Sequence, residues 1–211
     1  MNILVVVAHH DDLEIGCGGS IAKLIAAGNR VTCLVMTNSE YSSAQGVVIR
    51  RREDAAAESI LAARTLGYEI ISIDQNCFDI AMSDANACHI LRAIEQFGID
   101  TVFTHWHGDS HLPHRTVSAL TLHACRRIPR ILGFAVNWYI AEEAFQPRFF
   151  TAIEDDYWQL KMRALACYRT EFMRAGKLWS EHLDRTTRNY GLQIGVNRAE
   201  GFIPYKFTWV V

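Results

Sequence analysis

Short apolar runs and longer segments with helical periodicity alternate through the first two thirds of the chain. The runs are continuously apolar, as is typical of parallel strands buried on both faces, and span residues 3–8, 31–37, 70–73, 101–104 and 131–136. Helical segments at residues 20–27, 50–66, 85–97 and 113–126 separate them, three of which end at or before a glycine. This alternation predicts an α/β fold, a Rossmann-like, mostly parallel, doubly wound sheet flanked by helices.

The pattern after residue 150 is less regular. Residues 154–172 are predicted to be helical, with Asp155 and Asp156 near the N-terminus complementing the helix dipole. Residues 185–201 mix Arg, Gln, Asn and Gly and predict an irregular segment over the sheet, and 202–211 alternate like a final strand. We find no repeat and no linker, so we expect a single domain over 1–211.

Composition narrows the class of protein. The chain has 211 residues, of which 50% are hydrophobic and 21% charged, so intrinsic disorder is excluded. No apolar run approaches the ~20 residues of a membrane span, and the net charge of −2 argues against general nucleic-acid binding. The six cysteines are scattered without a C-x-x-C pair and predict free thiols, and the apolar start lacks a basic targeting region. We therefore expect a cytoplasmic protein, and a homo-oligomer is compatible with the sequence.

Six of the nine histidines fall in two short windows, each directly after a predicted strand. The first window holds His9 and His10, and the second holds His105, His107, His111 and His114. The carboxyl ends of parallel strands lie at one edge of a sheet, where open α/β sheets bind ligands. The two windows therefore face each other if their strands are neighbours.

Imidazole and carboxylate donors together suit Zn²⁺ or another divalent first-row metal. His9 and Asp12, three residues apart, with one remote histidine would supply three ligands and leave a position open for water. Asp11 is then the expected general base, and a remaining histidine would act as acid or stabilise the oxyanion. Helix capping is the structural alternative for this pair of carboxylates.

A second interpretation is a dinucleotide-binding turn at residues 16–20, with Glu40 on the ribose, as in a Rossmann-like nucleotide-binding module or NAD-dependent enzyme. Against it, Ile21 occupies the position of the third glycine, and Asp11, Asp12 and Glu14 would crowd negative charge around a pyrophosphate.

Several stretches resemble the PIG-L/LmbE-like N-deacetylase family. Residues 8–14 followed by glycines are similar to its A-H-P-D-D-E signature, with His10 in place of proline and Leu13 before Glu14. Residues 109–114 resemble its D-x-H-x-D-H signature, with Pro113 where an aspartate is usual. Weaker similarity covers Glu58 with the helix that ends at Gly67, and a C-terminal stretch of Lys161, Ala164, Leu165, Tyr168, Thr170 and Glu171.

The resemblance implies a Zn²⁺-dependent N-deacetylase that removes acetyl from an N-acetylated, GlcNAc-type amino sugar in a biosynthetic pathway. It implies that His9, Asp12 and His114 bind the metal, that Asp11 is the base, and that His111 is the acid or oxyanion partner. Because Pro113 stands where the signature has an aspartate, a further alternative is a relative that binds the metal but is catalytically silent. Asp109 is the residue that could take the role of that aspartate instead. Candidates for substrate contact or support of the site are Glu14, Asp109, His10, His107, Trp106 and Arg198, with ordinary core or surface roles as the alternative.

Overall fold

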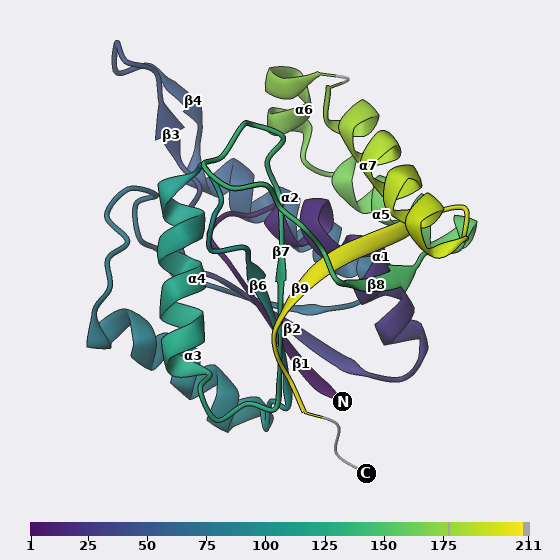
Figure 1. Cartoon of the computed structure of the whole chain (residues 1–211). Helices are drawn as coiled ribbons and strands as arrows, with labels where there is room; N and C mark the ends of the chain where they lie inside the picture. Colours follow the sequence, from purple (N-terminus) through teal and green to yellow (C-terminus); the bar gives the residue numbers. More distant parts are fainter. Residues whose placement is uncertain (177, 209–211) are drawn as a thin grey trace.

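The computed structural model describes residues 1–176 and 178–208, and a seven-stranded sheet forms its centre (Figure 1). The strand order is β5-β2-β1-β6-β7-β9-β8. Strands β5, β2, β1, β6 and β7 run parallel, whereas β9 runs antiparallel to β7 and β8. The sheet strands are β1 (Asn2–Val7), β2 (Arg30–Val35), β5 (Glu69–Ser72), β6 (Thr101–His105), β7 (Arg130–Phe134), β8 (Phe149–Ala152) and β9 (Ala199–Phe207). The predicted α/β class with a mostly parallel sheet is confirmed.

Helices cover both faces of this sheet. They are α1 (Asp12–Ala26), α2 (Arg52–Leu66), α3 (Asp84–Phe97), α4 (Leu112–Ala124), α5 (Asp155–Leu165), α6 (Arg169–Ala175) and α7 (Leu178–Ile194). Alternate residues of β1 point to opposite cores: Val5 and Val7 pack in the core under α1, α2 and α5, and Leu4 and Val6 pack in the core under α3 and α4. This two-sided burial explains why the strand is continuously apolar.

The glycines after β1 lie inside a helix. Helix α1 already begins at Asp12, so residues 16–20 do not form the turn that a dinucleotide-binding site requires. A Cβ on Gly16 would lie 2.1 Å from the ring of Phe134, and one on Gly19 would lie 3.1 Å from Ile153. These glycines allow α1 to pack closely against Phe134 and Ile153. The nucleotide-binding interpretation is wrong, because the glycines lie within a helix and not in a turn.

Residues 41–50 form a hairpin that the sequence pattern did not predict. Strands β3 (Tyr41–Ser42) and β4 (Val48–Arg50) pair in antiparallel fashion and project away from the central sheet (Figure 1). Both strands are too short to show a clear alternation. Arg50, predicted to begin a helix, ends β4 instead, and α2 begins at Arg52.

The C-terminal third departs most from prediction. The expected helix over 154–172 is two helices, α5 and α6, separated near Tyr168, whose ψ of 69° is not helical. The irregular segment expected over 185–201 is wrong, because α7 extends to Ile194 and β9 begins at Ala199. The buried residues of α7 are spaced four apart and are Trp179, Leu183, Thr187 and Gly191. Thr187 and Gly191 are not strongly apolar, so the helical period was weak in the sequence. Of the strand predicted at 202–211, β9 covers the part to 207, and residues 209–211 lie outside the described residues.

Among the helices that the structure describes, none combines the length and the apolar character needed to cross a bilayer.

Candidate active site

The loops that follow β1 and β6 meet at the carboxyl edge of the sheet. The two strands pair in parallel, with Val6 opposite Thr104, so the loops that follow them leave the same edge of the sheet. Strand β1 also lies where the strand order changes direction, the usual ligand position in such sheets. A cavity of about 550 Å³ opens there, and its charged and imidazole lining comprises His9, Asp11, Asp12, Arg50, His111, His114, Glu171 and Arg174.

Three side chains converge in the floor of this cavity. His9 Nδ1 lies 3.1 Å from His114 Nε2 and 3.3 Å from Asp12 Oδ2, and His114 Nε2 lies 3.4 Å from Asp12 Oδ1. Donors of a tetrahedral zinc site, each about 2.0–2.1 Å from the ion, are ~3.3 Å from one another. The spacing and the donor types of these residues therefore fit a divalent first-row metal.

His114 is oriented by Asp109. The Nδ1–H of His114 donates to Asp109 Oδ2 at 3.0 Å, which leaves Nε2 unprotonated toward the converging donors. Asp109 also accepts hydrogen bonds from the backbone of His111 and from Asn137, at 2.8 and 2.9 Å. Burial opposes ionisation of Asp109, but the hydrogen bond and the charge of His114 lower its pKa to about 2. Asp109 thus remains a charged partner for His114.

His105 lies beneath the converging donors. Its ring stacks on His114 with centroids 4.1 Å apart and planes 4° apart, and its Nε2 lies 3.2 Å from Asp12 Oδ2. Burial, followed by the charge of His114, lowers its pKa to about 4. Two groups of three donors among the described residues could hold a metal, His9 with His111 and His114, and Asp12 with His105 and His114. His114 belongs to both groups.

Without a metal, His9 and Asp12 form a charged pair in the cavity. Burial disfavours a charged His9, but the neighbouring Asp12 carboxylate raises the pKa of His9 to about 10. Burial also opposes ionisation of Asp12, yet the histidines around it, His114 first, keep its pKa well below the ordinary value. A metal ion bound here would have to displace the proton that His9 holds.

Asp11 lies beside these donors in an unusual backbone conformation. Its φ of 140° is rare for a residue with a side chain, and it precedes α1 without capping that helix by its side chain. Asp11 lines the cavity and is 7% exposed. Burial raises the pKa of Asp11 well above the ordinary value, and the Arg50 guanidinium acts in the opposite direction. A buried carboxylate next to a metal position can accept a proton from water.

His111 forms the wall of the cavity facing Phe78. Its ring centroid lies 5.1 Å from that of His9 and 4.8 Å from that of His114, and it meets the ring of Phe78 edge to face. Burial and the nearby charge of His114 lower the pKa of His111 to about 4. Its imidazole is therefore neutral near pH 7.

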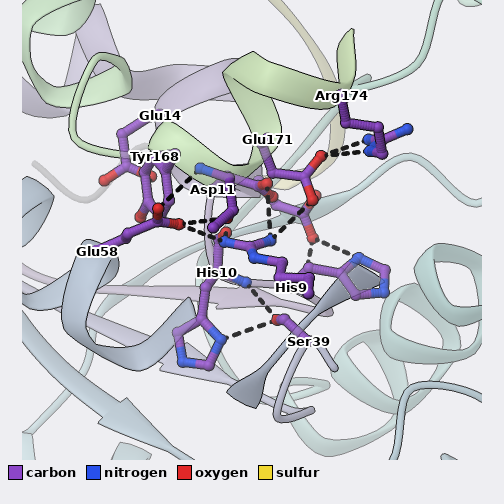
Figure 2. Close-up of polar contacts among 12 residues, drawn as sticks. His9, His10, Asp11, Glu14, Ser39, Glu58, Tyr168, Glu171 and Arg174 are labelled. Atoms are coloured by element: carbon purple, nitrogen blue, oxygen red, sulfur yellow. Dashed lines mark hydrogen bonds and ion pairs between the residues drawn. The ribbon is translucent and has the colours of Figure 1, made fainter. Parts of the chain in front are cut away.

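Two candidates near the end of β1, His10 and Glu14 (both labelled in Figure 2), are not part of the cavity lining. The His10 ring bonds to Ser39 and Ser72 at 2.8 and 2.9 Å. Glu14 is fully buried and accepts hydrogen bonds from Tyr68 and Tyr168 at 2.5 and 3.1 Å. Burial raises the pKa of Glu14 to about 7.

The three remaining candidates also lie outside the cavity lining that the described residues form. Trp106 is buried against Phe145, and His107 is exposed and pairs with Tyr205. Arg198 forms an ion pair with Asp184 at 2.6 Å and lies over the ring of Trp158 at 4.2 Å. Arg198 therefore belongs to the packing of α7 and not to the cavity.

Sequence reasoning missed a second group in the cavity. Arg50 from the hairpin lies among the carboxylates of Asp11, Glu58 and Glu171. These three acidic residues, labelled in Figure 2, come from the residue before α1, from α2 and from α6. Arg174 binds the other oxygen of Glu171 at 2.8 Å. Glu58 and Glu171 stood in the stretches of weaker family similarity, but no local pattern singled out Arg50. The aromatic lining was also missed: Tyr41, Phe78, Trp138, Tyr139 and Trp179.

Comparison with known proteins supplies a family match. The model of a family described as GlcNAc-PI de-N-acetylase (PIG-L) matches residues 4–125, more than half of the 211 residues. The match covers both histidine windows and the whole converging group.

Individual relatives align over most of the chain. An uncharacterized deacetylase of Escherichia coli K12, YaiS, is 30% identical over 175 residues, covering 80% of this chain and 90% of that protein. The diacetylchitobiose deacetylase of Thermococcus kodakarensis is 27% identical over 235 residues, covering 99% of this chain and 85% of that protein. The structure of N,N'-diacetylchitobiose deacetylase from Pyrococcus horikoshii superimposes with a TM-score of 0.82 at 21% identity, covering 96% of this chain and 83% of that one.

Proposed function

We propose a function from the premise that this chain belongs to the GlcNAc-PI de-N-acetylase (PIG-L) family and is a deacetylase. The proposed reaction is the Zn²⁺-dependent hydrolysis of the acetamido group of an N-acetylated amino sugar, which releases acetate and a free amine. The observation that carries the proposal is the mutual proximity of His9, Asp12 and His114 at the cavity, with donor atoms 3.1 to 3.4 Å apart and Asp11 next to Asp12 in the chain.

His9, Asp12 and His114 would hold the zinc ion. When bound, such an ion polarises the amide carbonyl and lowers the pKa of water. The hydrogen bond from His114 to Asp109 fixes the ring so that Nε2 faces the ion position. This support does not depend on residue 113, where the family signature has an aspartate and this chain has Pro113. The position of Asp109 therefore argues for an active enzyme and against a silent relative.

Asp11 accepts a proton from the attacking water as the water adds to the amide carbon. His111 is neutral, so one ring N–H is available to donate a hydrogen bond to the developing oxyanion. Collapse of the tetrahedral intermediate breaks the C–N bond, and the proton held by Asp11 passes to the leaving nitrogen. The products are acetic acid and the amine, Asp11 is again a carboxylate, and the acid then loses its remaining proton so that acetate and the ammonium form of the amine leave at neutral pH.

The shape and lining of the cavity support a sugar substrate. Its volume of about 550 Å³ can hold one or two sugar rings, and aromatic side chains in its wall, among them Tyr41, Trp138 and Trp179, offer flat apolar faces to such rings. The relatives named for diacetylchitobiose act on a sugar of this class. We therefore propose N,N'-diacetylchitobiose and N-acetylglucosamine derivatives as first substrates to test.

Metal analysis combined with an Asp11→Asn variant tests the proposal. The purified protein is expected to contain, or to take up, about one zinc ion and to release acetate from N,N'-diacetylchitobiose. Asp11→Asn should keep the metal and lose at least ~100-fold in kcat, as general-base removal predicts. A protein that neither contains nor binds zinc, or an Asp11→Asn variant with full turnover, would contradict the metal site or the mechanism respectively.

A further inference from the structure

Arg50 is a buried charge at the base of an exposed hairpin. It is 3% exposed, whereas its neighbours Val48 and Ile49 on β4 are 48% and 50% exposed. A guanidinium is costly to remove from water unless hydrogen bonds and opposite charges compensate for the loss. The partners of Arg50 therefore indicate what this residue does.

The partners of Arg50 come from three separate elements. Its Nη1 donates to Asp11 Oδ2 at 3.4 Å and to Glu171 Oε1 at 3.3 Å. Its Nη2 donates to the backbone oxygen of His10 at 3.3 Å and to Glu58 Oε2 at 3.5 Å. Glu58 also accepts from the backbone and hydroxyl of Thr170, at 2.8 and 2.7 Å, so its carboxylate is fixed between α2 and α6. Glu58 and Glu171 thus hold the guanidinium in place next to Asp11.

Two of these contacts enclose the torsion that makes Asp11 unusual. The carbonyl of His10 belongs to the peptide before the Asp11 N–Cα bond, and the carboxylate of Asp11 follows that bond. Arg50 contacts both groups, so it restrains rotation about the bond, whose φ is 140°. A side chain in this part of φ,ψ space persists only when its surroundings hold it there.

We propose that Arg50 is a positioning residue for Asp11: its planar fork holds the Asp11 backbone in the strained conformation and directs the carboxylate into the cavity. This inference rests on the proposed function, in which Asp11 accepts a proton from water. A lysine ammonium has three N–H donors, so it cannot reproduce the four contacts that Arg50 makes from two nitrogens of its planar fork. The effect of Arg50 on turnover is thus exerted through Asp11 and depends on the shape of the guanidinium.

A double-mutant cycle on turnover tests the proposal. Arg50→Ala, Asp11→Asn and the double variant are compared with the unmodified protein, each loaded with zinc, on N,N'-diacetylchitobiose. Arg50→Ala should lower kcat at least ~10-fold with little change in KM, and should lower it far less in the Asp11→Asn background.

Two further measurements test the shape of the guanidinium. Arg50→Lys should recover only part of the kcat that Arg50→Ala loses, and guanidinium added to the assay should raise the kcat of Arg50→Ala. Arg52→Ala is the matched control, because Arg52 is 51% exposed and pairs with Asp74 away from the cavity lining.

The proposal would be overturned if Arg50→Ala lowered kcat by the same factor in both backgrounds. It would also be overturned if Arg50→Ala were as active as the control variant Arg52→Ala. If the unmodified protein hydrolyses none of the N-acetylated sugars, the proposed function fails, and thermal unfolding of the same four proteins then decides the positioning role. The fall in Tm caused by Arg50→Ala should be smaller in the Asp11→Asn background, because the buried Asp11 charge that Arg50 compensates is gone. An equal fall in both backgrounds would overturn the contact itself. Zinc affinity, measured alongside, should be unchanged by Arg50→Ala, since Arg50 touches none of the three proposed ligands.

Discussion

His114 donates a hydrogen bond to Asp109 at 3.0 Å. In the sequence, Asp109 precedes and His114 directly follows Pro113, the position where the family signature usually has an aspartate. Asp109 is itself held by the backbone of His111 and by Asn137. The orientation of one proposed metal ligand therefore depends on a residue that precedes α4 and not on the first turn of that helix. This arrangement separates the support of the metal site from Pro113.

Removal of the Asp109 carboxylate should weaken metal binding. Asp109→Ala leaves the Nδ1–H of the buried His114 without its acceptor, so the ring is no longer held with Nε2 toward Asp12. We expect a 10- to 100-fold loss of zinc affinity, measured by competition with a chromogenic chelator. Asp100→Ala, a change at a carboxylate on the opposite edge of the sheet, serves as the control and should leave zinc affinity unchanged.

Loss of the His111 side chain should affect chemistry more than metal binding. His111→Ala removes the proposed oxyanion donor, and we expect kcat to fall by roughly 10²- to 10³-fold, as for other removed oxyanion donors. Steady-state kinetics on N,N'-diacetylchitobiose measures the effect, and metal content is determined on the same samples. A loss of zinc together with the loss of activity would instead place His111 among the metal ligands, as its group with His9 and His114 allows.

Zinc uptake should release protons. The pKa of His9 is raised to about 10, against burial and chiefly by Asp12, so its imidazole is protonated at pH 7 in the metal-free protein. Asp12 also raises the pKa of His114. Since zinc binds the neutral imidazole, its apparent affinity should rise with pH by about tenfold per unit for each proton displaced. Calorimetry in buffers of different ionisation enthalpy counts these protons. Zinc binding that is independent of buffer and pH would contradict the assignment of the ligands.

Glu14 should make the stability of the protein depend on pH. Its pKa is about 7 when folded, raised by burial from the ordinary value of 4.5. Between these values the folded state keeps a proton that the unfolded state has lost, so stability falls as the pH rises from about 4.5 to 7. Glu14→Gln removes this loss of stability, which is on the order of 3 kcal/mol. Urea unfolding at pH 5 and pH 8 should show a smaller difference for Glu14→Gln than for the unmodified protein.

Gly16 should not tolerate a side chain. The Cβ of Gly16→Ala would lie 2.1 Å from the ring of Phe134, so α1 or β7 must shift, and we expect a loss of about 1–3 kcal/mol. Gly18→Ala is the matched control in the same helix, because its Cβ would lie 3.3 Å from the flexible Lys161 side chain. Gly18→Ala should be far milder, since alanine also favours the helix by up to about 1 kcal/mol. Denaturant unfolding of both variants measures the contrast.

The parallel strands could be predicted because each is a continuous apolar run, and that property is local. Helix α7 could not, because Thr187 and Gly191 occupy buried positions on its inner face and weaken the apolar period. The start of α1 at Asp12 was missed for a related reason: Gly16, Gly18 and Gly19 usually indicate a turn, but here they lie in a helix pressed against neighbouring side chains. In each case the tertiary contacts outweighed the local preference.

The sequence by itself determined the α/β class, the two strand ends that carry histidine and aspartate, and the local pair of His9 and Asp12, because these depend on neighbouring residues. Only the tertiary structure decided which remote side chains join that pair. The parallel pairing of β1 and β6 brings His114 to within 3.1 Å of His9, and the packing of the hairpin and α6 brings Arg50 and Glu171 to Asp11. Such distances depend on strand register and helix packing between segments about 40 to 160 residues apart, which no local pattern encodes.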